Sequence, residues 1–432
     1  MKQRRTRKED SADHEVPSMV AYEHALLIAL ESIRPLEATR CPLEQSLGRV
    51  VAQDIRATKN LPEVDRSAMD GYALRSADTL QAETSRPVRL KIAGEILSNT
   101  ERPAGITAGE TIAIMTGGPV PRGADTIVKR EDVESDGETI TLKVAIPSGR
   151  HISEKGKEMA KGSLITKKGT MINPVAYSVL AGLRMSKVPV MERPSVSIMV
   201  IGNELGDLSD EGDGHKIVAS NLFLLSALME NTGAQVALAR ITKDDKAAIQ
   251  ADLEEGLQND LLITTGGTWH SRSDLTRSAM EAAGIRFRFS GMSVVPGKGT
   301  SFGLFKGRPV FALPGAPSAV FTVFHTLVLP CLRKLTGQEP TGPATIAAVL
   351  EQDLHRRPGL EHFVTGQVSL KEGEYRVRPI GKPDQSIFSA MAMANGFIVV
   401  PADQEHRKRG AIVSVQLFEP WASTSPLVPT NS

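Results

Sequence analysis

The chain has 432 residues, of which 41% are hydrophobic and 23% are charged, and its formal net charge is +1. This length predicts several domains rather than one core, and the composition is typical of a soluble globular protein. The near-neutral charge and the 4% of aromatic residues argue against a protein that binds nucleic acid or an anionic membrane.

The chain ends predict little structure. Residues 1–17 form a basic stretch in which acids follow Arg4 and Arg5, so we expect a disordered tail rather than an export signal or a transit peptide. Residues 421–432 also predict disorder. Cys41 and Cys331 fit no zinc or disulfide pattern, which indicates a reducing, cytoplasmic compartment. No run approaches the ~20 apolar residues of a membrane helix.

The first half of the chain predicts two interleaved regions. Residues 18–60 and 151–194 are expected to form an N-terminal helical linker domain, into which residues 61–150 are inserted as a β-rich lid. MVAYEHALLIALESI has apolar residues at three- and four-residue steps, which is typical of a helix. In the lid, short β-like runs alternate with Gly/Pro turns. After the lid, NPVAYSVLAGLRM predicts a helix with Pro174 in its first turn.

The second half predicts an α/β domain followed by a β domain. Strands alternate with helices over residues 195–338, so we expect a doubly wound, mostly parallel sheet and an α/β multidomain protein. Three buried strands end in the loops IGNEL, TTGG and LPGAP, which should converge on one crevice, because ligands bind beyond the carboxyl ends of such strands. Residues 343–420 alternate apolar and polar residues and predict a small barrel or sandwich.

Two acids follow these strand ends. Glu204 of IGNEL and Asp274 beyond TTGG would suit Mg²⁺, which prefers oxygen ligands. Asp274 equally suits the N-cap of the helix that follows it, and one residue can do both. Ser220 or Asn221 is expected to cap an earlier helix in the same way.

Two loops have features that suit an anion-binding site. Gly266 and Gly267 open like a phosphate loop, but Trp269, His270 and Arg272 follow where small residues would fit better. In LPGAP, the prolines fix the backbone ahead of a helix. Its free N–H groups either bind an anion or belong to a purely structural turn.

Two further motifs are ambiguous from the residues alone. GMSVVPGKGT resembles a P-loop but has the wrong glycine spacing and no Ser/Thr after its lysine, so Lys298 is either an anion contact or part of a surface turn. SAMDGYA places Asp70 beside a glycine that allows close backbone approach, and its residues favour a turn with a buried tyrosine.

The order of the motifs is more specific than any one of them. SAMDGYA, TGGPVPRGADTIVKRED, IGNEL, TTGG with a later acid, PGK and LPGxP follow one another over about residues 60–320. In this order they resemble the molybdopterin molybdenumtransferase family, which includes MoeA-type proteins and the gephyrin E domain. The resemblance implies a helical–β first region with an inserted lid, a MogA-like α/β domain and a C-terminal β domain.

The resemblance also implies a function. Family members insert molybdenum from molybdate into adenylylated molybdopterin and release AMP with the aid of Mg²⁺, as homodimers. Molybdopterin adenylyltransferase and recipient molybdoenzymes are then candidate partners, and nucleic acid and membranes are not. The implied catalytic residues are Asp70, Thr116, Glu158, Glu204, Asp274, Pro314 and Pro317. The implied substrate contacts are Ser220, Asn221, Gly266, Gly267, His270 and Lys298. Glu204 and Asp274 are the implied metal ligands.

Several positions depart from the family pattern. Glu158 replaces the usual Asp, and the remaining changes are an acid lost at Ala219, lysines lost at Gly291 and Val295, an asparagine lost at Ala316 and a serine lost at Gln385. A charged hydrogen bond contributes ~1.5–3 kcal/mol, so losing two cations would weaken anion binding. Arg272 or Arg277 is a candidate to replace one of the lost cations.

Three functions therefore stay open. The retained acids favour a divergent enzyme of this family. The lost cations and Ala219 favour a paralogue that binds molybdopterin or the finished cofactor and passes it on without turnover. A scaffold that keeps only the dimer is the third, since a fold alone does not guarantee activity.

Overall fold

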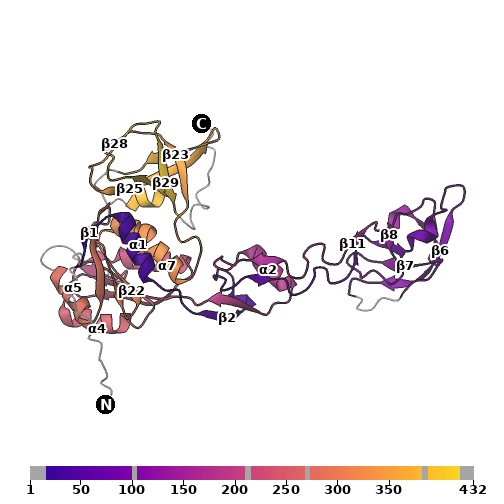
Figure 1. The fold of residues 1–432 in the computed structure, drawn as a ribbon, viewed down its shortest axis with the longest axis horizontal. Helices are drawn as coiled ribbons and strands as arrows, with labels where there is room; N and C mark the ends of the chain where they lie inside the picture. Colours follow the sequence, from indigo (N-terminus) through magenta and orange to yellow (C-terminus); the bar gives the residue numbers. More distant parts are fainter. Residues whose placement is uncertain (1–15, 100–104, 210–215, 268–272, 382–387, 419–432) are drawn as a thin grey trace, which may run out of the picture.

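The computed structural model describes residues 16–99, 105–209, 216–267, 273–381 and 388–418. Figure 1 shows an elongated molecule. The inserted lid lies at one end, the α/β and C-terminal domains lie together at the other end, and a narrow linker joins the two ends. The chain crosses this linker twice, since the lid is inserted within it.

The α/β domain is built on a seven-stranded sheet with the order β1-β19-β21-β22-β18-β14-β17. The strands are β1 (Ser18–Val20), β14 (Ser195–Ile201), β17 (Gln235–Thr242), β18 (Leu261–Thr265), β19 (Arg286–Met292), β21 (Ser301–Phe305) and β22 (Arg308–Leu313). Its centre, β22-β18-β14-β17, is parallel, and β21 runs antiparallel to both of its neighbours. The predicted mostly parallel sheet is confirmed.

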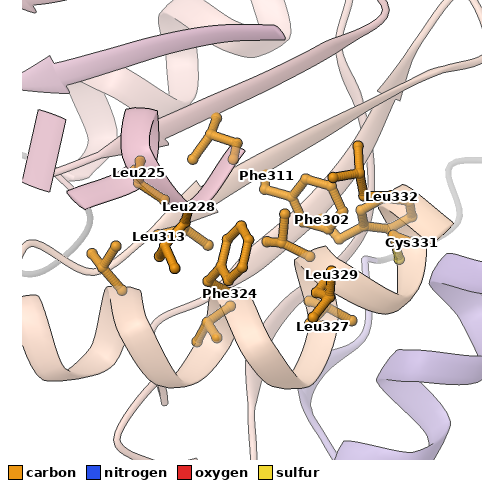
Figure 2. Close-up of a cluster of buried hydrophobic side chains, with 14 of the residues drawn as sticks. Leu225, Leu228, Phe302, Phe311, Leu313, Phe324, Leu327, Leu329, Cys331 and Leu332 are labelled. Atoms are coloured by element: carbon orange, nitrogen blue, oxygen red, sulfur yellow. The ribbon is translucent and has the colours of Figure 1, made fainter. Parts of the chain in front are cut away.

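Helices cover both faces of this sheet, as the doubly wound prediction requires. They are α1 (Tyr22–Ser32), α3 (Ser220–Asn231), α4 (Lys246–Gly256), α5 (Ser273–Ala282), α6 (Pro317–Val323), the π-helical segment Phe324–Val328 and α7 (Leu329–Leu335). One core holds side chains from α1, α3 and the α6–α7 helix, and a second core on the other face holds side chains from α4 and α5. Figure 2 shows the first core, where Phe302 and Phe311 of the sheet meet Phe324 and Leu327 of the long helix.

The N-terminal segment differs from the sequence expectation. Residues 18–20 form β1, which pairs with β19 in the α/β sheet, and the helix begins only at Tyr22. Ala25, Ala29 and Ile33 are buried in the core of the α/β domain. The apolar period predicted the helix correctly, but it could not show that this helix packs on a sheet whose other strands begin at Ser195.

One helical run meets the length and composition of a membrane helix, which contradicts the expectation that no run would approach them. Among the described residues, the helical run Pro317–Leu335 is long and apolar enough by length and composition to cross a membrane. In this structure 83% of its most apolar window is buried inside the protein. Its hydropathy is accounted for by packing against the sheet and α3.

The linker contains short paired strands and one helix. These elements are β2 (Ala38–Pro42), η1 (Leu43–Gln45), β3 (Ile55–Arg56), β4 (Arg66–Ser67), β11 (Ile152–Ser153), β12 (Leu164–Thr166), α2 (Pro174–Gly182) and β13 (Lys187–Met191). Strands from before and after the lid pair with one another, such as β2 with β13. Pro174 opens α2, and Asn173 caps it by accepting a hydrogen bond from the Ala176 N–H, which confirms the predicted helix start.

The lid is a six-stranded sheet with the order β8-β5-β7-β6-β10-β9. Its elements are β5 (Gly71–Leu74), η2 (Ser76–Thr79), β6 (Val88–Ile96), β7 (Glu110–Ile114), β8 (Thr126–Lys129), η3 (Arg130–Asp132), β9 (Glu134–Ser135) and β10 (Thr139–Leu142). The short β-like runs predicted in the lid are confirmed as strands β6, β7, β8 and β10. Apolar clusters on the two faces of the sheet give the lid its own core.

The C-terminal domain is a closed five-stranded barrel with the strand order β25-β26-β23-β29-β27, closed by pairing between β25 and β27. Its elements are β23 (Thr345–Leu350), β24 (Leu354–His355), β25 (Glu361–Lys371), β26 (Glu374–Pro379), α8 (Phe388–Met393), β27 (Gly396–Val400), β28 (His406–Arg407) and β29 (Ile412–Leu417). The short strand β20 (Val294–Val295) of the α/β domain pairs in parallel with the start of β25. Of the two predicted architectures, the barrel is the one observed.

The buried core of the α/β domain should make the largest contribution to the free energy of unfolding of that domain. Phe311→Ala removes a fully buried ring beside Phe302, and we expect a loss of about 3–5 kcal/mol. Phe223→Ala on α3 is the matched control, because that ring is 41% exposed. Urea unfolding followed by far-ultraviolet circular dichroism measures both, and equal midpoints for the two variants would contradict the assigned core.

Candidate functional site

The carboxyl ends of β14, β18 and β22 lie side by side. These strands are neighbours in the parallel part of the sheet, and their registers align Val200 with Thr265 and Thr265 with Leu313. The loops that follow therefore leave the sheet at one edge. The predicted convergence of IGNEL, TTGG and LPGAP is confirmed.

Glycines allow these loops to approach closely. Gly266 has a φ of 91°, and a Cβ atom there would lie 2.2 Å from the Ile201 carbonyl oxygen. Gly267 has a φ of 68°, and its Cβ would lie 2.5 Å from Thr276 Oγ1. A side chain at either position would both strain the backbone and overlap its neighbour. Gly266 is thus required to bring the end of β18 against the end of β14, and Gly267 to bring it against α5.

Asn221 ties the third loop into the cluster. Its side chain is 7% exposed, and its Nδ2 donates to the Gly315 carbonyl oxygen at 2.8 Å and to Thr265 Oγ1 at 3.3 Å. Thr265 Oγ1 in turn donates to the Pro314 carbonyl oxygen at 2.9 Å. Asn221, expected to contact substrate, therefore holds the LPGAP loop through side-chain bonds, and Thr265 is a positioning residue that the sequence did not reveal.

Several polar atoms at this edge are buried without a partner among the described residues. They include Asn221 Oδ1, Thr264 Oγ1 and Thr276 Oγ1. An unpaired buried polar atom costs about 1–3 kcal/mol, so such atoms need a reason. Thr276 faces Gly267, the last described residue before position 268. Trp269, His270 and Arg272 lie outside the described residues, and so do Gln385 and Ser386.

Both expected metal ligands follow strands that end at this edge, but the structure describes the side chain of Glu204 only. Glu204 is exposed, and its Oε1 lies 2.7 Å from where a Cβ on Gly202 would be, so its carboxylate folds back over the end of β14. Asp274 is in the first described turn of α5, and its side chain is outside the described part of the chain. The expected pairing of the two acids therefore stays a prediction.

Two helices begin at the same edge without a side-chain cap. Ala219 is the N-cap of α3, and Ala316 is the N-cap of α6, with Pro317 as the first helical residue. The expectation that Ser220 or Asn221 caps α3 was wrong, because the helix already begins at Ser220 and Asn221 turns its side chain to Gly315. Uncapped first-turn N–H groups favour a bound anion.

Lys298 lies on the loop that enters β21. That strand starts opposite the end of β22, with Ser301 paired to Ala312, so the loop stands at the same sheet edge. The Lys298 side chain is exposed. No helix follows the PGK turn, since β21 comes directly after it, which confirms that this segment is not a P-loop.

The lid holds a second group of expected residues. Asp70 Oδ1 accepts hydrogen bonds from the Thr116 backbone N–H at 2.6 Å and from Thr116 Oγ1 at 2.7 Å. The Thr116 hydroxyl, then its N–H, hold the pKa of Asp70 below its usual value, and the charge of Arg130 adds to this. A Cβ on Gly71 would lie 2.0 Å from the Val128 carbonyl oxygen, which confirms the expected close approach. Tyr72 is buried in strand β5, so SAMDGYA opens a strand rather than a simple turn.

Within one chain, three of the expected catalytic residues lie away from the strand ends. Glu158 is exposed between β11 and β12 in the linker, where its N–H donates to the Leu61 carbonyl oxygen at 3.0 Å. Asp70 and Thr116 lie beside β5 and β7 in the lid. Figure 1 shows β7 and β8 at the opposite end of the molecule from β22 and α5. The structure thus assembles one group at the strand ends and one in the lid, with Glu158 in the linker, rather than one site.

Known families account for almost the whole chain. Residues 20–183 match the MoeA N-terminal region (domain I and II), residues 197–334 match a probable molybdopterin binding domain, and residues 347–418 match the MoeA C-terminal region (domain IV).

Full-length relatives agree with these matches. The molybdopterin molybdenumtransferase of Staphylococcus aureus strain MSSA476 is 31% identical over 91% of this chain and 94% of its own length. That of Staphylococcus epidermidis is 30% identical over 87% and 90%. The crystal structure of the molybdopterin biosynthesis MoeA protein from Pyrococcus horikoshii superimposes with a TM-score of 0.81 at 30% identity, covering 93% of this chain and 100% of that one. The chain belongs to the MoeA family of molybdopterin molybdenumtransferases.

Proposed function

We propose that this chain inserts molybdenum, supplied as molybdate, into adenylylated molybdopterin and releases AMP. The observation that carries the proposal is the convergence of three strand-end loops with two uncapped helix N-termini at one sheet edge. Phosphate groups are the ligands that such an edge favours. The relatives that are named for this reaction match the chain almost end to end.

The same edge supplies ligands for Mg²⁺. Glu204 offers an exposed carboxylate three residues after the end of β14. Glu204 and Asp274 would hold the ion. When bound, Mg²⁺ neutralises negative charge on a pyrophosphate. The uncapped starts of α3 and α6 would hold phosphate oxygens, and Gly266 and Gly267 would let the loop come close to them.

We also propose that the working unit is a homodimer in which the lid of one chain covers the strand ends of the other. Asp70 and Thr116 are hydrogen-bonded to each other in the lid, yet they lie at the far end of their own chain. A second copy in a closed two-fold arrangement supplies the missing group to each site. The two buried, unpaired cysteines support a cytoplasmic setting for this unit.

A non-catalytic carrier is the alternative, and Gly291 favours it. Gly291 has a φ of 90°, and a Cβ there would lie 3.2 Å from Met19 Sδ, so strand β1 stands where a lysine side chain would start. Arg277 does not replace that charge, because it already bonds Glu281 at 2.9 Å and Ser290 at 2.7 Å. Among the described residues, the binding edge therefore holds fewer cations than the family pattern has.

AMP release distinguishes the two functions. Purified protein is incubated with adenylylated molybdopterin, molybdate and Mg²⁺, and we expect Glu204→Gln to release AMP at least ~100-fold more slowly than the parent, which is about 2.7 kcal/mol in the barrier. The control is Glu230→Gln, the same change on an exposed residue near the other end of α3. Raising Mg²⁺ should recover part of the lost rate.

The possible outcomes separate cleanly. Equal rates for Glu204→Gln and Glu230→Gln would contradict the assigned role of Glu204. A parent protein that binds the adenylylated substrate tightly and releases no AMP would be a carrier. A parent that does not bind it would leave a scaffold.

The lid carboxylate gives a second prediction. Asp70→Asn keeps an oxygen that accepts both Thr116 hydrogen bonds and removes only the charge. Because the pKa of Asp70 is lowered, its charge is present at neutral pH and is lost only as the pH falls through that lowered pKa. We therefore expect a turnover defect of the same size at every pH from about 5 to 8. Turnover equal to that of the parent at every pH would show that the charge is not what matters, and a defect that fades toward about pH 5 would contradict the lowered pKa.

A further inference from the structure

The C-terminal domain carries a cluster of metal-ligating side chains far from the site described above. Asp353, His355 and His406 stand on the two-stranded ribbon formed by β24 and β28. Figure 1 shows β28 at the outer end of the C-terminal domain, away from β22 and from the lid. Neither the reaction nor the proposed dimer uses these residues.

The ribbon places all three side chains on one face. His355 and His406 are directly opposite each other in the antiparallel register, and Asp353 precedes His355 by two residues. Side chains two apart on a strand point the same way, and opposite residues on paired strands have neighbouring Cβ atoms. Leu354, between Asp353 and His355, points inward and is buried, which fixes the outward direction of the other two.

The ligand atoms are close to the separation that one ion requires. One nitrogen or oxygen from each residue lies within 4.8 Å of the others, and His406 Nε2 is 3.7 Å from Asp353 Oδ2. The ligands of a tetrahedral zinc ion lie about 3.3 Å apart, given metal–ligand bonds of ~2.0–2.1 Å. The two imidazole rings are stacked with centroids 4.0 Å apart, and both are exposed, so both rings are free to turn out of the stack, as binding one shared ion requires.

The carboxylate is already held in place. Asp353 Oδ1 accepts a hydrogen bond from the Arg409 backbone N–H at 2.7 Å, which leaves Oδ2 on the side of His406. An outer hydrogen bond that orients a ligand is a common feature of metal sites.

The donor set selects the kind of ion. Two imidazoles and one carboxylate suit Zn²⁺ and similar transition-metal ions, whereas Mg²⁺ and Ca²⁺ prefer oxygen ligands only. The neighbouring Arg407, Lys408 and Arg409 also oppose a cation that is held by charge alone. Three protein ligands leave a fourth position for water or an outside group.

We propose that Asp353, His355 and His406 form a binding site for one divalent transition-metal ion of the zinc class on the surface of the C-terminal barrel. The ion joins β24 to β28, two strands of only two residues each. Binding therefore stabilises this ribbon against opening.

Zinc titration of the untagged, full-length protein tests the proposal. Metal is first removed with a chelator, and Zn²⁺ is then added in a calorimeter with excess Mg²⁺ present to occupy oxygen-only sites. We expect one Zn²⁺ per chain, and binding at least ~100-fold weaker in His406→Ala and in His355→Ala, since even an outer-sphere change costs 10–100-fold. His24→Ala is the matched control, an exposed histidine on α1.

A second readout separates coordination from a surface ion pair. Asp353 and a protonated His406 would form an ion pair without help from His355. If the cluster were only such an ion pair, His355→Ala would not change metal binding. With Co²⁺ as the probe, the parent should show visible absorption bands that His355→Ala, His406→Ala and Asp353→Asn each reduce. Circular dichroism verifies that the variants are folded.

The result that overturns the proposal is clear. A parent that takes up no Zn²⁺, or a parent and His406→Ala that titrate alike, would show that the cluster binds no metal. AMP release is measured on the same His406→Ala protein and should be unchanged, because the ribbon lies outside the strand-end edge. Failure of this site therefore leaves the proposed reaction untouched, and failure of the reaction leaves this site untouched.

Discussion

The close passage of Gly266 over the Ile201 carbonyl oxygen is the constraint on which the strand-end site depends. With only 2.2 Å for a Cβ atom, no other residue lets the loop after β18 cross the end of β14. Once that loop is in place, Thr265 and Asn221 reach the carbonyl oxygens of Pro314 and Gly315 and fix the third loop. The starts of α3 and α6 then face the same edge. The shared position of these loops and helix starts, rather than any single strong bond, makes this edge suited to phosphate.

The elongated architecture follows from how the chain is interleaved. The N-terminus supplies β1 and α1 to the α/β domain, and the chain then leaves through the linker, builds the lid and returns. This arrangement gives the lid a core of its own and keeps its Asp70–Thr116 pair away from the strand ends of the same chain. The shape thereby favours the proposed sharing of each site between two chains.

The sequence predicted those features that local patterns encode. Buried strands bounded by glycines marked β14, β18 and β22, and the Asp-Gly pair marked the close contact at Gly71. It failed where distant residues decide the outcome. Nothing near Ser18 shows that it pairs with β19, and nothing near Ser220 shows that Ala219 stands at the N-cap while Asn221 bonds Gly315. Thr265 and the Asp353–His355–His406 cluster were invisible for the same reason, since partners far apart in the chain give them their roles.

A mixed dimer tests the shared site most directly. Two differently tagged chains, one carrying Asp70→Asn and the other Glu204→Gln, are produced together, and the dimer with both tags is isolated. If each site takes its lid from the partner, one of the two sites in this dimer is unaltered, and we expect about half of the parent's AMP release although each variant alone is strongly impaired. If lid and strand ends of the same chain worked together, both sites would be damaged. A mixed dimer as inactive as the two parent variants would contradict the shared site.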